Sequence, residues 1–439
     1  MQRARIVLFL LLAPGALVAQ EASVASLGGD ALPGELRFHD VIRSAVSASP
    51  LVEAARARLR SAEASRITAR TIPAPLATIW VENAALPGRS SRGAVPETSV
   101  STTLPLEFLY QRGARTRVAE EEIRIAEAEL HGARWLVALD AARAFERVAA
   151  AQSAVDGAVD LRKGIEELRA YNERRVSEGA AAEGELLRVR TEVERAVIEE
   201  ALARAELARA WAELRQFVPA AAAAPAPLKA PRVVVAAGPP AAGATPGLAD
   251  LLAQARAQQP ALAAARARLD AARAGETYQQ TLRVRQLGAT LGAKSSGGET
   301  TLIAGLSVPL PIFDRNRGEI ARAAAERAAA EYDLEWTERQ VIARIEAARA
   351  ATELLATQLT AIPRDLLARA EESRQIALVA YREGAGTLVQ VLDASRALSD
   401  LRQAYYRTLL AFEQSRLDMQ EAAGSDPATV LDSFKGDFR

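Results

Sequence analysis

Apolar and polar residues alternate along four short stretches of the chain. From residue 302 to residue 310 every even-numbered position is Leu, Ala or Val, with Gly305 and Ser307 among the residues between them. Residues 283–294 show the same period of two, and a polar loop at 295–299 joins the two stretches. This period is typical of strands, so we expect a hairpin with strands at about 283–294 and 300–310.

A noisier pair of such stretches lies in the first half of the chain, at about 76–84 and 98–106. All four are close to the ~9–11 residues with which a tilted strand crosses a bilayer. A soluble hairpin with one wet face would show the same alternation, so the pattern alone leaves both possibilities open.

Long helical patterns surround the strand-like stretches. Each half predicts a helix of about thirty residues, a very long helix and a return helix, at 36–70, 112–173 and 183–216, and again at 247–280, 318–382 and 387–422. Apolar residues from Leu334 to Ile362 recur at intervals of three, four or seven, as in a coiled-coil seam. A helix of ~60 residues is about 90–100 Å long, far longer than a globular domain needs. Pro363 lies inside one such run, where a kink is expected.

The two halves are copies of one plan. Pro50 matches Pro260, and the AARARL of Ala54–Leu59 recurs at Ala264–Leu269. The stretch EGAAAEGELL at 178–187 matches EGAGTLVQVL at 383–392 in the same register. We therefore expect two tandem repeats at 36–217 and 247–422, an Ala/Pro-rich linker or surface segment at 218–246, and a C-terminal tail at 423–439.

The N-terminus predicts export. Two arginines precede a short apolar run, and small residues follow it, which is typical of a cleaved signal peptide at residues 1–20. The remaining chain offers no run of ~20 apolar residues that could form a membrane helix. An exported chain of this kind would enter a membrane as a β-barrel.

Composition excludes several classes of function. Basic and acidic residues balance at 55 each, so there is no basic footprint for nucleic acid. The chain has no Cys and only two His, which rules out a cluster of soft metal ligands and gives no indication of a cofactor. Phosphate-binding loops and nucleophile motifs are missing too, so we do not expect an enzyme.

Four strands are too few for a membrane barrel. Bacterial barrels begin at about eight strands, and an open sheet edge is not tolerated in lipid. Closure therefore requires several copies, with eight strands from two or twelve from three. Pro309 and Pro311 lie where a barrel strand would end and a long helix would begin.

The duplicated plan resembles the TolC-like outer-membrane efflux proteins over essentially the whole mature chain. The stretches GLSVPLPIFDRNRGEI at 305–320 and YREGAGTLVQVLDA at 381–394 are similar to the cation-efflux (CzcC-like) branch of that family. The resemblance implies a mainly α fold with a membrane β-barrel, assembled as a homotrimer with a twelve-stranded barrel and a twelve-helix periplasmic tunnel. It further implies outer-membrane lipid around the barrel, and a periplasmic adaptor and an inner-membrane resistance-nodulation-division pump as partners.

The resemblance also assigns candidate sites to the ends of the long helices. Turns at 176–184 and 383–387, with Gly179, Gly184, Gly384 and Gly386, would form the tunnel tip and meet the adaptor. Gly179 and Gly384 are expected to have positive φ at helix C-termini.

Carboxylates just beyond these turns narrow the tunnel in the family, and the matching positions hold Glu185, Gln390 and Asp393. Gln390 departs from the acidic pattern, which would weaken cation attraction at that level. Three chains would still give rings of Glu185 and Asp393, a cation-selective constriction, and acids on a solvated helix face are the alternative. At the barrel–helix junction, Pro309, Pro311, Asp314 and Arg317 suggest a salt-bridged joint or interfacial anchor rather than a transport role.

The function expected is the outer-membrane exit channel of a tripartite efflux system for heavy-metal cations. A multidrug or type I secretion duct is the alternative. A periplasmic adaptor is disfavoured because it would have one helical hairpin between β-rich domains, and a soluble coiled-coil scaffold would not need four alternating stretches.

Overall fold

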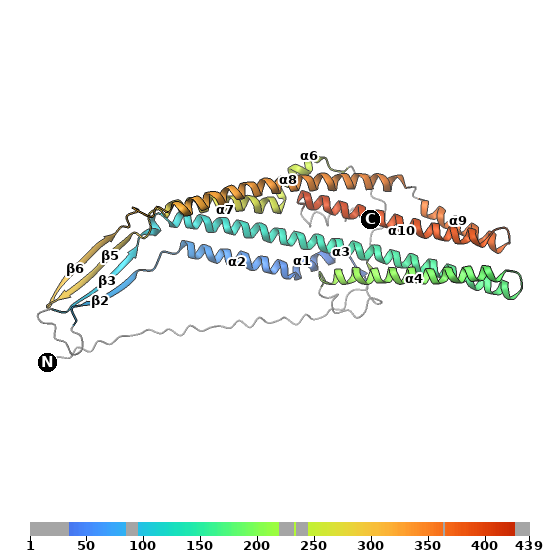
Figure 1. Cartoon of the computed structure of the whole chain (residues 1–439), viewed down its shortest axis with the longest axis horizontal. Coiled ribbons are helices and arrows are strands. Elements are labelled where there is room, and N and C mark those ends of the chain that lie inside the picture. Colours follow the sequence, from blue (N-terminus) through green and yellow to red (C-terminus); the bar gives the residue numbers. More distant parts are fainter. Residues whose placement is uncertain (1–34, 85–94, 219–231, 234–244, 363–364, 426–439) are drawn as a thin grey trace.

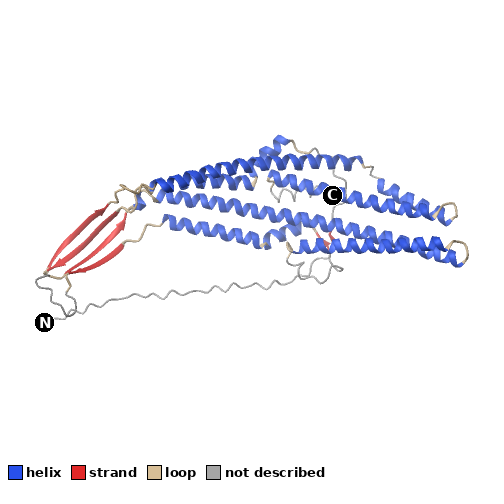
Figure 2. Cartoon of the chain, in the orientation of Figure 1, coloured by secondary structure: helices blue, strands red, loops and turns tan. Residues whose placement is uncertain are grey.

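The computed structural model describes residues 35–84, 95–218, 232–233, 245–362 and 365–425. The protein is elongated, with a small sheet at one end and long helices that run away from it (Figure 1). Its helices are α1 (Phe38–Ala48), α2 (Pro50–Arg70), η1 (Glu107–Leu109, a 3-10 turn), α3 (Arg112–Ser177), α4 (Glu183–Arg215), α6 (Leu248–Gln258), α7 (Pro260–Thr281), α8 (Arg317–Ala361), α9 (Leu366–Arg382) and α10 (Leu388–Ala423). Its strands are β1 (Glu35–Leu36), β2 (Leu76–Glu82), β3 (Glu97–Pro105), β4 (Arg232–Val233), β5 (Gly288–Ser296) and β6 (Glu299–Ser307). The mainly helical architecture predicted from the sequence is confirmed (Figure 2).

The four longer strands form one antiparallel sheet in the order β2-β3-β5-β6. Hairpin β2–β3 belongs to the first repeat and β5–β6 to the second, and β3 joins them by pairing with the whole of β5. Strand β5 begins later than the expected residue 283, because Gln286 has a φ of 61° that interrupts extended backbone. Strand β6 ends at Ser307, two residues before Pro309, which has no N–H for the ladder.

The register sorts the side chains of this sheet by charge. Alternate residues of a strand point to opposite faces, and directly paired residues share a face. The pairs Glu82–Glu97, Glu97–Ser296 and Ser296–Glu299 therefore lie on one face, together with Lys294. All four charged residues of the four strands share this face, which we call the polar face. The opposite face, called the apolar face, consists of Ala77, Ile79, Val81, Thr98, Val100, Thr102, Leu104, Ala289, Leu291, Ala293, Ser295, Thr300, Leu302, Ala304 and Leu306.

The helices continue the order of the strands. Helices α2 and α7 lead into β2 and β5, while α3 and α8 follow β3 and β6, and these helices contact one another in the order α2-α3-α7-α8. Farther from the sheet, α3 packs against α4 and α10, and α10 packs against α8 and α9. One lateral edge of the protein is thus formed by α2 and α4, and the other by α8 and α9 (Figure 1).

Proline divides the first predicted helix of each repeat. A single helix of about thirty residues was expected at 36–70 and at 247–280, and both predictions are wrong because each stretch forms two helices. The breaks fall at Ser49 and Gln259, whose backbones are extended with ψ of 124° and 116°. Each precedes a proline at the first turn of the next helix, and proline disfavours helical backbone at the residue before it.

The second very long helix is also interrupted. Helix α8 ends at Ala361 and α9 begins at Leu366, whereas α3 runs unbroken through the matching part of the first repeat. Pro363, where the sequence predicts a kink, lies outside the described residues.

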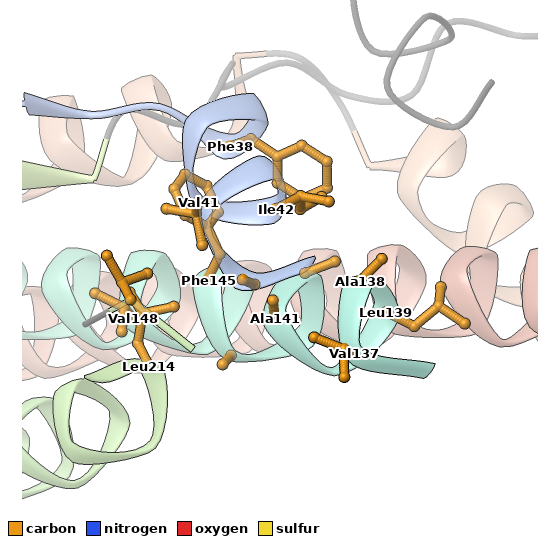
Figure 3. Close-up of a cluster of buried hydrophobic side chains, with 14 of the residues drawn as sticks. Phe38, Val41, Ile42, Val137, Ala138, Leu139, Ala141, Phe145, Val148 and Leu214 are labelled. Atoms are coloured by element: carbon orange, nitrogen blue, oxygen red, sulfur yellow. The ribbon is translucent and has the colours of Figure 1, made fainter. Parts of the chain in front are cut away.

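The largest core cluster lies where α1 packs on α3. The rings of Phe38 and Phe145 meet edge to face with centroids 5.4 Å apart (Figure 3). Around them α3 buries mostly small side chains, such as Ala138, Ala141 and Val148. Small side chains let helices approach closely, so the core is a thin layer between helices.

Several predicted segments lie outside the described residues, namely the signal peptide at 1–20, most of 218–246, and the tail beyond Ser425. Of the segment between the repeats, β4 pairs in parallel with β1. None of the described helices is both long and apolar enough to cross a bilayer.

Candidate functional site

The candidate site lies at the end of the helices farthest from the sheet, which we call the tip (Figure 1). It contains the turn between α3 and α4 and the turn between α9 and α10. Gly179 and Gly384 have φ of 72° and 77°, which confirms the left-handed backbone expected there. In each turn the glycine N–H donates to the carbonyl three residues earlier, and the next N–H, of Ala180 or Ala385, donates to the carbonyl five residues earlier. This is the Schellman pattern, so the two repeats end their long helices in the same way.

The other two tip glycines differ from each other. A Cβ at Gly386 would lie 3.1 Å from Cβ of Ala380 and 3.2 Å from N of Tyr381, so this position is tight. A Cβ at Gly184 would meet nothing within 4 Å. Only Gly386 therefore has a steric reason to lack a side chain.

A buried tyrosine connects the two helical hairpins of the tip, the first formed by α3 and α4 and the second by α9 and α10. The Tyr381 hydroxyl of α9 lies 2.5 Å from Oδ1 of Asn172 on α3 and 3.2 Å from Oε2 of Glu185 on α4. Asn172 is fully buried, and its Nδ2 donates to the carbonyl of Leu168. Burial, and then the neighbouring Glu185 carboxylate, raises the pKa of Tyr381. The phenol therefore remains a donor over the whole physiological pH range.

Aromatic and cationic contacts surround this tyrosine. The Tyr171 ring packs edge to face on the Tyr381 ring, with centroids 6.0 Å apart. The guanidinium of Arg175 lies 5.2 Å from the centroid of Tyr381 and 5.8 Å from that of Tyr171. The Tyr171 hydroxyl donates to the carbonyl of Arg382. The second hairpin is thus held to the first by a hydroxyl, a ring contact and a cation.

A second link lies farther from the turns. Arg396 of α10 donates to both carboxylate oxygens of Glu192 on α4, with Nε 3.3 Å from Oε2. The Glu192 side chain is 13% exposed and the Arg396 side chain 42%. These hydrogen bonds raise the pKa of Arg396. The pair borders a groove between the hairpins that Leu161, Ile165, Ala196 and Leu392 also line.

The three predicted constriction residues have different surroundings. Glu185 is half-buried and faces Tyr381. The Gln390 side chain accepts a hydrogen bond from the Thr387 N–H, and the Thr387 hydroxyl accepts one from the Gln390 N–H, which together form a capping box on α10. Asp393 is exposed, 3.9 Å from Arg396. In the described part of the chain, no hydrogen bond or ion pair joins any two of the three.

At the junction between β6 and α8, Pro309 and Pro311 lie in the connection and Arg317 begins the helix. Asp314 accepts a hydrogen bond from the N–H of Asn316 and lies 3.8 Å from Arg285. Asn316 is buried with a φ of 56°, and it binds both Arg285 and the carbonyl of Gln279. The joint is therefore held by an asparagine that the sequence analysis did not single out.

Sequence reasoning missed Tyr381, Asn172, Glu192, Arg396 and Asn316. Asn316 could have been found, because Asn tolerates left-handed backbone and stands directly before a helix. The other four give no signal in a single sequence, since their partners lie on a different repeat. No group of three or more His, Asp or Glu among the described residues is placed to hold a metal ion.

Comparisons with known proteins cover almost the whole chain. The family model described as outer membrane efflux protein matches residues 41–218 and 251–425. The cobalt-zinc-cadmium resistance protein CzcC of Cupriavidus metallidurans is 27% identical over 380 residues, which are 86% of this chain and 87% of that protein.

Solved structures share the fold. The outer membrane protein VceC of Vibrio cholerae superposes with a TM-score of 0.70 at 20% identity, covering 88% of this chain and 96% of that one. The CmeC outer membrane channel of Campylobacter jejuni gives a TM-score of 0.72 at 15% identity, with 92% and 90% covered.

Proposed function

The chain belongs to the outer membrane efflux protein family, and from this premise we propose that it is the exit duct for heavy-metal cations in a tripartite efflux system. It is an outer-membrane transport channel and not an enzyme. The substrate proposal is carried by one observation, the similarity along 86% of the chain to a protein named for resistance to cobalt, zinc and cadmium. The partners we propose are a periplasmic adaptor and an inner-membrane resistance-nodulation-division pump.

The sheet supports a membrane-spanning role. Its apolar face carries no charge, while all four charged residues of the strands share the other face. Leu291, Leu302 and Leu306 of the apolar face are each more than 60% exposed. Outward apolar and inward polar side chains are the pattern of a membrane barrel, so we assign the apolar face to lipid and the polar face to the lumen.

Closure of such a sheet requires other copies of the chain. Among the described residues of one chain β2 and β6 each pair on one side only, and an unpaired edge is not stable in lipid. Three copies of the four-stranded sheet would give twelve strands. We propose this trimer, in which β6 of each copy pairs with β2 of the next.

The helices support the same arrangement. Most of their exposed large apolar side chains lie on the lateral edges of the molecule. They are Leu51 and Ile67 on α2, Leu187, Val197, Ile198 and Leu202 on α4, Tyr332, Trp336, Ile342 and Leu354 on α8, and Ile376 and Val379 on α9. Copies placed side by side would bury these two edges against each other, which removes apolar surface from water.

The tip would be the periplasmic entrance. We propose that the turns with Gly179, Gly184, Gly384 and Gly386 contact the adaptor, and that Glu185 and Asp393 narrow the opening. Because Gln390 caps its own helix, its side chain is held by Thr387 and would contribute a neutral surface there. The Tyr381 hydroxyl and the Arg396–Glu192 pair would hold the second hairpin close to the first.

A tolerance assay tests the substrate. Cells that contain the matching pump and adaptor would be grown on graded cobalt, zinc and cadmium with and without this chain. We expect tolerance to all three ions to fall when the chain is removed and to return with its gene. Unchanged metal tolerance together with increased sensitivity to dyes or antibiotics would contradict the metal assignment and favour a multidrug duct.

A further inference from the structure

Among the described strands, the polar face of the sheet carries one aromatic residue, Trp80. The register places Trp80 of β2 opposite Ser99, Ser99 opposite Lys294, and Lys294 opposite Thr301. These four residues form one row across all four strands, and directly paired residues share a face. Trp80 therefore projects from the polar face, and its side chain is 60% exposed.

On the rows nearer the helices most residues of this face are small or hydroxylated, and Leu76, Pro105 and Ile303 are the apolar ones. The residues on the rows nearer the helices are Thr78, Ser101, Thr103, Thr290, Gly292, Ile303, Gly305 and Ser307, together with Leu76, Pro105 and Gly288 at the strand ends. The indole of Trp80 is the largest group that projects from this face of the described strands.

The row beyond Trp80, farther from the helices, is charged, and Lys294 lies in the same row as Trp80. Glu82, Glu97 and Glu299 contribute three carboxylates, and Lys294 contributes one ammonium group. Lys294 pairs with Glu97 and lies 4.0 Å from Glu82. With three negative charges and one positive charge, this end of the polar face is net negative, so cations would be concentrated beside the indole.

We propose that Trp80 forms an aromatic collar in the lumen, one indole from each copy at the same level, which binds passing cations through the indole faces. The collar rests on the proposed trimeric channel. An aromatic face attracts a cation through its quadrupole, and the attraction is greatest for cations that lose water easily, such as quaternary ammonium ions. The collar therefore favours weakly hydrated organic cations over anions, and it narrows the lumen for large solutes.

Cysteine labelling tests whether Trp80 faces the lumen. The chain has no cysteine, so Trp80→Cys introduces the only thiol. Ser99→Cys on the same face and Ile79→Cys on the apolar face are matched controls. In outer-membrane vesicles treated with a charged, membrane-impermeant maleimide, we expect Trp80→Cys and Ser99→Cys to react and Ile79→Cys to stay unlabelled.

The other outcomes separate the collar from the channel. Labelling at Ser99→Cys without labelling at Trp80→Cys would overturn the collar and leave the membrane sheet intact, since residue 80 would then not be accessible from the lumen. Equal labelling at Ile79→Cys and Ser99→Cys would overturn both, because the apolar face would not be in lipid.

Current block tests the binding of cations. In planar bilayers, tetraethylammonium should block the potassium current of the parent channel, and the blocking concentration should rise about two- to five-fold in Trp80→Ala. Trp80→Phe keeps an aromatic face and should stay close to the parent. Equal block of the parent and Trp80→Ala would overturn the collar, whereas the presence of current in both would still show a channel.

Discussion

Arg396 and Glu192 are 204 residues apart in the sequence and form a two-bond ion pair between α10 and α4. The pair bridges the two repeats where their hairpins run side by side toward the tip. The Glu192 side chain is largely shielded from water. Its negative charge is therefore stabilised by this one arginine to a greater extent than the charge of a surface carboxylate would be.

Arg396→Ala should loosen the tip. The substitution leaves the Glu192 carboxylate without its partner, at an expected cost of about 1–2 kcal/mol in local stability. Hydrogen exchange in residues 185–200 and 388–400 should become faster. Arg209→Ala is the matched control, because the Arg209–Glu206 pair is exposed on both sides and should contribute less than about 0.5 kcal/mol. Equal exchange in both variants would show that the buried pair has no special role.

Tyr381→Phe should open the entrance without disturbing the packing. The ring contacts with Tyr171 and Arg175 remain, but Asn172 and Glu185 lose the hydroxyl between them. We expect a higher single-channel conductance than in the parent. Tyr332→Phe, on α8 outside the tip, keeps the ring that a neighbouring copy would cover and should conduct like the parent. A Tyr381→Phe channel with parental conductance would contradict the role of this hydroxyl at the entrance.

Glu146 should make stability depend on pH. This carboxyl on α3 is 7% exposed. Its burial raises its pKa to about 7, and the nearby Glu413 charge adds to this rise while Arg416 opposes it. Because the folded state holds the proton more tightly than the unfolded state, the stabilisation is present below about pH 4.5 and is lost as pH rises through 7.

Glu146→Gln should remove this dependence. At pH 8 the variant should be more stable than the parent by on the order of 3 kcal/mol, with little difference at pH 4.5. Urea unfolding at several pH values measures the difference. Glu213→Gln, in the exposed pair with Arg147, should keep the parental pH profile. A parental slope in Glu146→Gln would mean that another group titrates.

Gly384→Ala should strain the second tip turn. Left-handed backbone costs a residue with a side chain about 1–2 kcal/mol, and Gly384 has a φ of 77°. Limited proteolysis at 383–387 should become faster. Gly184→Ala places the same methyl group in a helix with free space around it and should leave the cleavage rate unchanged or lower it. Faster cleavage in Gly184→Ala alone would contradict the turn geometry.

The sequence predicts the parts of this fold that depend on local patterns. The alternation around Leu302 and Leu306 identified a strand because successive residues of a strand point to opposite faces of the sheet. Gly179 and Gly384 marked the turns because few other residues adopt their backbone. The splits before Pro50 and Pro260 were missed, although both prolines were recognised as repeat landmarks, because the apolar pattern continues across them.

Contacts between the repeats could not be predicted in the same way. Nothing near Asn172 or Glu192 indicates which residue of the second repeat will face it, since the partner depends on how two long hairpins align. Gln390 was interpreted as a substituted member of an acidic ring, whereas its local role is to cap α10 with Thr387. That role was readable from Thr387 and Gln390 alone, because their spacing is that of a capping box.

The assembly of three copies around one lumen is tested most directly by native mass spectrometry of the protein extracted in detergent from isolated outer membranes. We expect the mass of three chains, because neighbouring copies would pair the edges of β2 and β6 that have no partner among the described strands. A monomer from that membrane, or a protein found only in the soluble periplasm, would contradict both the barrel and the lumen built on it.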